Sequence, residues 1–181
     1  MRESALALGL SASGSKESQD ICFIPRGESY IDFIESRIGS LPEGEYIDKD
    51  QRVIGRHKGI LRYTVGQRKG LGASFGKHMF ITDISAKDNR ITLRPAEETF
   101  AAGIEVGSLN FQRLEGADGE YDLQLKIRYA AAPVPCRVRI EGDRAYVSFS
   151  QGIRTPAPGQ SAVFYSGDTL MLGGVIEKTH Y

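Results

Sequence analysis

The stretch 136–149, CRVRIEGDRAYVSF, decides the fold class of this chain. Cys136, Val138 and Ile140 alternate with two arginines, which is the period-two pattern of a strand with one buried face. The segment Glu141-Gly142-Asp143 has turn composition, and a second apolar-alternating run follows it. These residues therefore predict an antiparallel hairpin.

The same pattern continues in both directions from this hairpin. Short strands with turn signals every ~8–12 residues are typical of a small barrel or sandwich. We therefore expect a mainly β protein made of two small β units, with the joint between them in residues 95–103. The expected strands lie at 80–84, 90–93, 121–127, 162–165 and 170–176, and the expected turns at 86–89 and 166–168.

Two short helices are expected near the N-terminus. Residues 2–10 contain good helix formers. Residues 30–38 begin after Ser29, a plausible N-cap, and end before Gly39. Between the helices, 21–24 is an apolar run that predicts a strand or a buried turn.

The composition is that of an ordinary globular protein. Of 181 residues, 40% are hydrophobic and 25% charged, which excludes a disordered tail, a collagen and a disulfide scaffold. No apolar run approaches the ~20 residues of a membrane span, and no secretory signal is recognisable. With two cysteines and three histidines, none at ligand spacing, we expect a cytoplasmic protein without a metal site.

The net charge of zero hides a segregation of charges along the chain. Residues 1–50 have a net charge of −5 and residues 83–181 of −2, whereas residues 51–82 contain no acid. This middle stretch either presents a basic surface to a phosphate backbone or is a solvated loop neutralised by acids elsewhere. Its cations are Arg52, Arg56, Lys58, Arg62, Arg68, Lys69 and Lys77.

The basic stretch also holds six glycines, which predict turns and an extended loop rather than a helix. It does not form a nucleotide-binding P-loop. Gly72 and Gly76 are four residues apart instead of five, and His78 follows Lys77 where Ser or Thr is required. We expect no ATP or dinucleotide site within this chain.

Several other residues allow two readings each. Cys22, flanked by Ile21 and Phe23, is either a core residue or a reactive thiol, whereas Cys136 is expected in the core. Arg128 and Tyr129 suit a phosphate contact with base stacking, or a barrel-rim pair packed on 130–132. The Gln160 side chain either contacts a ligand or caps a turn.

Six blocks of sequence stand out, namely SQDICFI (18–24), GRHKG (55–59), YTVGQRKGLG (63–72), KIRY (126–129), PGQSAVFY (158–165) and LGGVI (172–176). Together they resemble the tRNA-specific 2-thiouridylase family (MnmA/TrmU). They occur in the family's order and at similar spacing over essentially the whole chain.

The resemblance implies an enzyme that uses ATP to adenylate the C2 oxygen of wobble uridine 34 and then substitutes sulfur. It implies that Cys22 carries the persulfide, that a second cysteine helps to release the sulfur, and that the whole enzyme forms a disulfide bond. It also implies tRNA contacts for Arg128, Tyr129 and Gln160. The basic stretch adds five expected tRNA-binding residues, namely Arg56, Lys58, Gln67, Arg68 and Lys69.

The chain departs from the family in one respect. The family's Ser-Gly-Gly-x-Asp-Ser pyrophosphatase loop is absent, so ATP is expected in a missing N-terminal domain and this portion alone is expected to be inactive. Residues 1–25 are then the tail of that domain, 26–97 a central domain with the basic loop, and 98–181 a barrel like those of translation factors.

The expected partners are the anticodon region of tRNA and a sulfur-donor protein carrying a persulfide. We expect a monomer with no membrane association. Two other classes of protein fit the residues, namely a stand-alone RNA-binding β-barrel and a sulfur-carrier or scaffold protein.

Overall fold

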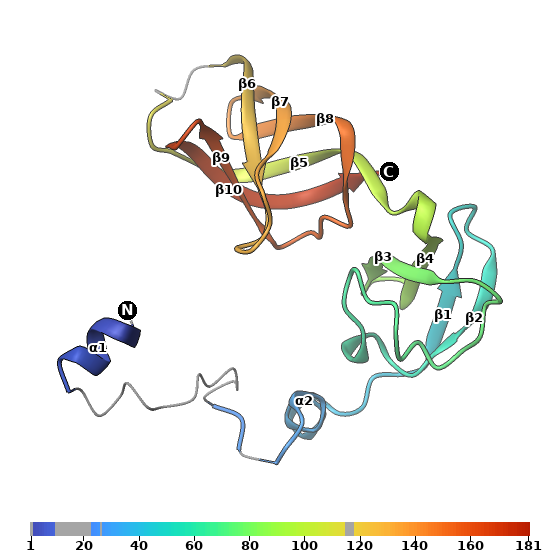
Figure 1. Ribbon diagram of the computed structural model, residues 1–181. Coiled ribbons are helices and arrows are strands. Elements are labelled where there is room, and N and C mark those ends of the chain that lie inside the picture. Colours follow the sequence, from blue (N-terminus) through green and yellow to red (C-terminus); the bar gives the residue numbers. More distant parts are fainter. Residues whose placement is uncertain (1, 10–22, 26, 115–117) are drawn as a thin grey trace. The chain divides into compact units, whose positions relative to one another are not determined.

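The computed structural model describes residues 2–9, 23–25, 27–114 and 118–181 (Figure 1). The chain divides into two compact units, Met1–Ser40 and Leu41–Tyr181. Strands hold 49% of the described residues and helices 12%, which confirms the mainly β class.

The first unit contains two helices, α1 (Arg2–Ala7) and α2 (Tyr30–Ile38). The expected cap of α2 is confirmed, because Ser29 Oγ accepts a hydrogen bond from the Asp32 backbone N–H at 3.1 Å. Gly39 ends the helix at a φ of 79°, which favours glycine. Helix α1 is shorter than expected and stops at Ala7.

The apolar run 21–24 was expected to be a strand or a buried turn. Phe23 and Ile24 form no strand, and the Phe23 side chain is 67% exposed, so the expectation is wrong for this half of the run. Ile21 and Cys22 lie outside the described residues.

The second unit begins with a four-stranded mixed sheet in the order β2-β1-β4-β3. The hairpin of β3 (Met79–Ser85) and β4 (Arg90–Pro95) confirms the expected strands and turn. Strand β1 (Gly44–Ile47) pairs parallel to β4, and β2 (Val53–His57) pairs antiparallel to β1. Neither β1 nor β2 was expected from the sequence.

A closed six-stranded barrel follows, in the order β10-β5-β8-β7-β6-β9 (Figure 1). It confirms the barrel expectation. The strands are β5 (Phe100–Phe111), β6 (Gly119–Lys126), β7 (Val134–Glu141), β8 (Arg144–Arg154), β9 (Ser161–Ser166) and β10 (Thr169–His180).

The joint between sheet and barrel is shorter than expected. A 3-10 turn, η3 (Ala96–Glu98), is followed at Phe100 by β5, so the second half of the expected 95–103 joint is already a strand. Small residues in this half hide the strand pattern. Gly103 is required there because a Cβ on it would lie 2.7 Å from the carbonyl oxygen of Val147 on β8.

Alternation along β7 builds the barrel core as the sequence predicts. Cys136, Val138 and Ile140 are buried, and the residues between them are exposed. Burial, and to a lesser degree the charge of Asp122, raises the pKa of the Cys136 thiol to about 12. The thiol is therefore protonated at neutral pH and donates to the Leu123 carbonyl at 3.5 Å, which confirms its core position.

Candidate nucleic-acid interface

The long connection between β2 and β3, residues 58–78, is named the basic loop here. It crosses the sheet and includes a 3-10 turn, η2 (Ile60–Arg62). Its own Tyr63 and Leu71 side chains are buried in the core of the sheet. The Tyr46 hydroxyl on β1 donates to the Leu71 carbonyl at 2.8 Å. These buried contacts anchor the loop to the sheet.

Backbone hydrogen bonds hold the first half of the basic loop to β3. The Gly66 N–H donates to the Ile81 carbonyl at 2.8 Å, and the Ile81 N–H donates to the Gln67 carbonyl at 2.9 Å. The Gln67 side chain accepts from the Thr64 N–H at 3.0 Å and donates to the Lys69 carbonyl at 2.8 Å. Gln67 therefore shapes the turn that presents Arg68 and Lys69.

The cations on this surface lack acidic partners. Arg56, Lys58, Arg68 and Lys69 are exposed, and no described carboxylate lies within ion-pair distance of any of them. Arg52, in contrast, has an acid close by, with its Nη1 3.9 Å from a carboxylate oxygen of Asp50. Within the described ranges, no acid is therefore placed to pair with these four cations.

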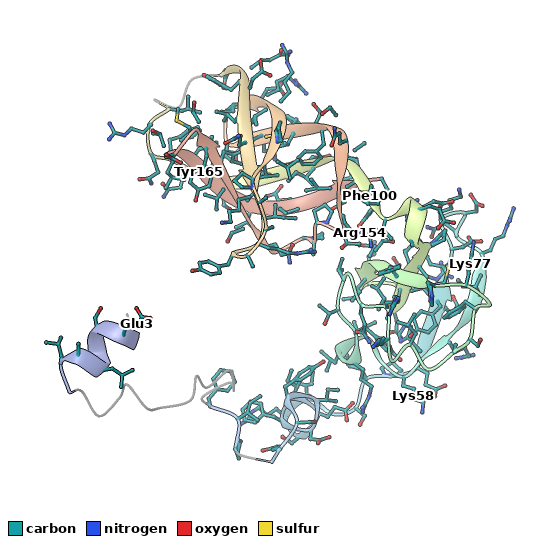
Figure 2. The ribbon with its side chains drawn as sticks, in the orientation of Figure 1. Glu3, Lys58, Lys77, Phe100, Arg154 and Tyr165 are labelled. Carbon is teal, nitrogen blue, oxygen red and sulfur yellow. The ribbon has the colours of Figure 1, made fainter. Side chains whose placement is uncertain are left out.

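An open hollow of about 830 Å³ lies along the second half of the basic loop, lined by residues 68 and 70–79. Its charged lining consists of Arg68 and Lys77, and Lys58 lies elsewhere on the loop (Figure 2). A second hollow of about 490 Å³ is lined partly by Asp48, Asp50 and Glu98. Only the first hollow is therefore suited to an anion.

His57 does not add to the positive charge of the basic stretch. It is 1% exposed, its Nε2 donates to the Asn89 carbonyl at 3.2 Å, and its Nδ1 accepts from the Gly59 N–H at 3.2 Å. Burial lowers the pKa of the imidazole, so the ring is neutral at pH 7. A Cβ on Gly44 would collide with the Asn89 carbonyl and the ring, so glycine is required there.

The expected tRNA-binding residues of the barrel lie in two loops. Tyr129, just after β6, is 98% exposed, and the Lys126 ammonium lies 5.8 Å from its ring centroid. Its exposure excludes the rim-packing reading for this ring. Gln160 accepts from the Ala157 N–H at 3.2 Å, so its side chain caps the turn before β9, as one of the two readings predicted.

Arg128 and the basic loop meet at Thr155. The Arg128 Nη2 donates to the Thr155 carbonyl at 3.0 Å. A Cβ on Gly66 would lie 3.3 Å from Thr155 Oγ1, so the Thr155 side chain lies close to the Gly66 backbone. Sequence reasoning missed Thr155, because nothing in its neighbours indicates that it contacts residues 27 and 89 positions away.

Other expectations fall outside this surface. Cys22 lies outside the described residues, and so does any disulfide that it forms; Cys136 is a free thiol. Within the described ranges, no group of three or more His, Cys, Asp or Glu is placed to hold a metal ion. No described helix is both long and apolar enough to cross a bilayer.

Comparisons with known proteins agree with this architecture of a sheet followed by a barrel. Residues 31–94 match the family described as "tRNA methyl transferase PRC-barrel domain". Residues 101–176 match the one described as "Aminomethyltransferase beta-barrel domain". The fold and its two matches thus define the class, a two-part β region of tRNA-modifying enzymes.

Curated relatives narrow the class to one family. The chain is 38% identical over 178 residues to the tRNA-specific 2-thiouridylase MnmA of Clostridium botulinum (strain Eklund 17B / Type B). It is 39% identical over 180 residues to that of Carboxydothermus hydrogenoformans and 38% over 184 residues to that of Chlorobium phaeovibrioides. These alignments cover 98–99% of this chain and 49–51% of each relative.

The chain belongs to the tRNA-specific 2-thiouridylase family, as the sequence blocks predicted. It spans about half the length of the curated relatives it matches.

Proposed function

We propose that this chain is the tRNA-binding part of an enzyme that catalyses ATP-dependent 2-thiolation of wobble uridine 34. The observation that carries the proposal is a set of exposed cations without a described acidic partner, namely Arg56 on β2 and Lys58, Arg68 and Lys69 on the basic loop that the sheet core holds in place. Such cations suit a phosphate backbone, because each contact releases condensed counterions. The family membership supports tRNA as the nucleic acid.

The proposed surface combines two kinds of contact. Arg56, Lys58, Arg68 and Lys69 contact phosphates and set the register of the tRNA, with Gln67 holding the turn. Tyr129 offers an exposed ring for stacking on an unpaired base, as single-stranded RNA loops require. Arg128 and Gln160 complete the barrel side of the surface in this proposal.

The chemistry that we propose divides between this chain and the remainder of the enzyme. ATP binds outside the residues of this chain and adenylates the uracil C2 oxygen, which is otherwise a poor leaving group. The terminal sulfur of a persulfide on Cys22 attacks C2, and AMP leaves with the former C2 oxygen. A second cysteine then attacks the Cys22 sulfur, releasing the sulfur to the base and forming a disulfide. A thiol reductant then reduces the disulfide, and the donor protein's persulfide transfers its outer sulfur to the Cys22 thiol.

A salt titration of tRNA affinity tests the binding role. Arg68→Ala and Lys69→Ala should weaken binding to every tRNA sequence and reduce the slope of log affinity against log salt by up to ~1 each. Arg137→Ala is the matched control, since this exposed barrel arginine is paired with Glu120 at 2.6 Å. If both loop variants keep the tRNA affinity and the salt slope of the unmodified chain, the basic loop does not bind RNA.

Tyr129→Ala separates stacking from electrostatics. Loss of a stacked base should cost ~1–3 kcal/mol of binding free energy with little change in salt slope, because stacking releases no counterions. If Tyr129→Ala binds tRNA with unchanged affinity, the ring is not part of the interface and the binding is electrostatic alone.

Cys22→Ser in the full-length enzyme tests the sulfur role. A hydroxyl is almost isosteric with a thiol but cannot carry a persulfide, so thiolation should be abolished while tRNA affinity stays nearly unchanged. Mass spectrometry of nucleosides from the tRNA product measures the result. Substantial residual 2-thiouridine would favour the alternative in which this region only binds RNA.

A further inference from the structure

Thr155, directly after β8, has an unusual backbone for its residue type. Its φ is 42°, in the left-handed region that β-branched residues rarely adopt, and its side chain is 3% exposed. Such a conformation persists only where the surrounding structure imposes it, and it is frequent at functional sites. The contacts of Thr155 indicate what imposes it.

Three separate segments of the chain contact this one residue. The Thr155 N–H donates to the Thr99 carbonyl, in the joint before β5, at 2.9 Å. Its carbonyl accepts from Arg128 Nη2 at 3.0 Å, and its Oγ1 lies 3.4 Å from the same nitrogen. On the other side, Oγ1 faces Gly66 of the basic loop.

Neighbouring contacts belong to the same junction of sheet and barrel. The guanidinium of Arg154 lies 4.8 Å from the Phe100 ring centroid and 5.8 Å from that of Phe80 on β3 (Figure 2). The Tyr181 hydroxyl donates to the Thr82 carbonyl at 3.3 Å. Thr155 is therefore part of a packed contact and not of an isolated loop.

Gly66 makes the close approach possible. Its φ of 90° is a conformation that favours glycine, and a Cβ there would press on Thr155 Oγ1. Arg68 and Lys69 follow Gly66 by two and three residues. The position of these cations relative to Arg128 therefore depends on Thr155.

We propose that Thr155 is a positioning residue for tRNA binding. It orients the Arg128 guanidinium through its carbonyl and hydroxyl, and it holds the basic loop against the barrel at Gly66. The cations of the loop and the Arg128–Tyr129 pair then form one preorganised surface, which lowers the conformational cost of binding. This inference rests on the proposed tRNA-binding function.

The experiment compares Thr155→Gly with Thr155→Ser. Glycine tolerates the positive φ and keeps the backbone hydrogen bonds, but it removes Oγ1 and the packing on Gly66. Serine restores Oγ1. Thr179→Val is the matched control, because the Thr179 hydroxyl donates to the Pro156 carbonyl at 3.1 Å and, among the described residues, makes no hydrogen bond to the basic loop.

The first measurement is amide hydrogen exchange in the tRNA-free chain. Thr155→Gly should speed exchange of the Gly66 and Gln67 amides by about tenfold, since these report local opening of the loop. Thr155→Ser and Thr179→Val should stay near the rate of the unmodified chain. Unchanged exchange in Thr155→Gly would overturn the proposal, whatever happens with tRNA.

The second measurement is the salt titration of tRNA affinity on the same variants. Thr155→Gly should lower affinity about three- to tenfold, the range that one lost hydrogen bond covers, with an unchanged salt slope. Faster exchange with unaltered affinity would overturn the positioning role. If the unmodified chain does not bind tRNA, the proposed function fails, and this positioning role fails with it even where the exchange result shows that Thr155 holds the loop.

Discussion

The barrel and the four-stranded sheet obtain their cores in different ways. Every fully buried apolar residue of the barrel core lies on one of its own strands. The sheet core instead recruits Tyr63 and Leu71 from the basic loop. The barrel is thus closed by strand pairing alone, whereas the sheet is completed by the segment that carries the proposed tRNA-binding cations. We therefore expect the stability of the sheet and the proposed tRNA binding to be coupled.

The largest effect is expected in the barrel core. Phe164 on β9 is fully buried, so Phe164→Ala should lower the free energy of unfolding by about 3–5 kcal/mol through lost burial and a residual cavity. Urea unfolding measures this loss. Leu170→Ala, at a side chain that is 38% exposed, is the control and should cost less than about 1 kcal/mol.

The next effect tests whether the basic loop is a core element. Leu71→Ala should cost about 2–4 kcal/mol and should also weaken tRNA binding, because the loop loses its main anchor. The rate of amide hydrogen exchange should rise in the sheet and stay unchanged in the barrel. A loss of stability that leaves tRNA affinity intact would break the coupling of stability and function.

A smaller loss of stability is expected when a single buried hydroxyl is removed. Tyr46→Phe removes the donor to the Leu71 carbonyl and leaves a buried acceptor unpaired, at a cost of about 1–2 kcal/mol. Tyr165→Phe is the matched control in the barrel (Figure 2), since the Tyr165 hydroxyl has no hydrogen-bond partner among the described residues. Equal losses in urea unfolding would show that the hydrogen bond to the loop contributes nothing.

The smallest expected effect is a pH dependence of folding stability that arises from His57 in the sheet. The pKa of His57 is lowered in the folded state, so the unfolded chain binds the proton more tightly. The contribution of neutral His57 to the free energy of unfolding is fully present above about pH 6.5. It is lost as the pH falls below that value towards the pKa of His57 in the folded state. His57→Gln should flatten this fall between pH 7 and pH 5. An identical pH profile in the variant would assign the dependence to other groups.

Local patterns predicted the parts of the molecule in which one face of a strand is buried. Alternation along 136–149 predicted β7 and β8, and the hairpin of 162–165 and 170–176 predicted β9 and β10, but β5 was not predicted. Ser29 with Gly39 marked the two ends of helix α2. Strand β1 escaped prediction because three of its four residues are buried, which removes the alternation. Its place depends on parallel pairing with β4, more than forty residues away.

The sequence by itself determined the barrel strands other than β5, the family and the acid-free run of cations, since periodicity, motifs and charge are properties of neighbouring residues. Only the tertiary structure decided that His57 is neutral, that Gln67 shapes the loop, and that Thr155 joins Arg128 to the basic loop. Each of these depends on an environment built by packing, often from segments far apart in the chain. Burial and hydrogen-bond partners, which set the pKa of a ring or the role of a side chain, exist only once those segments have met.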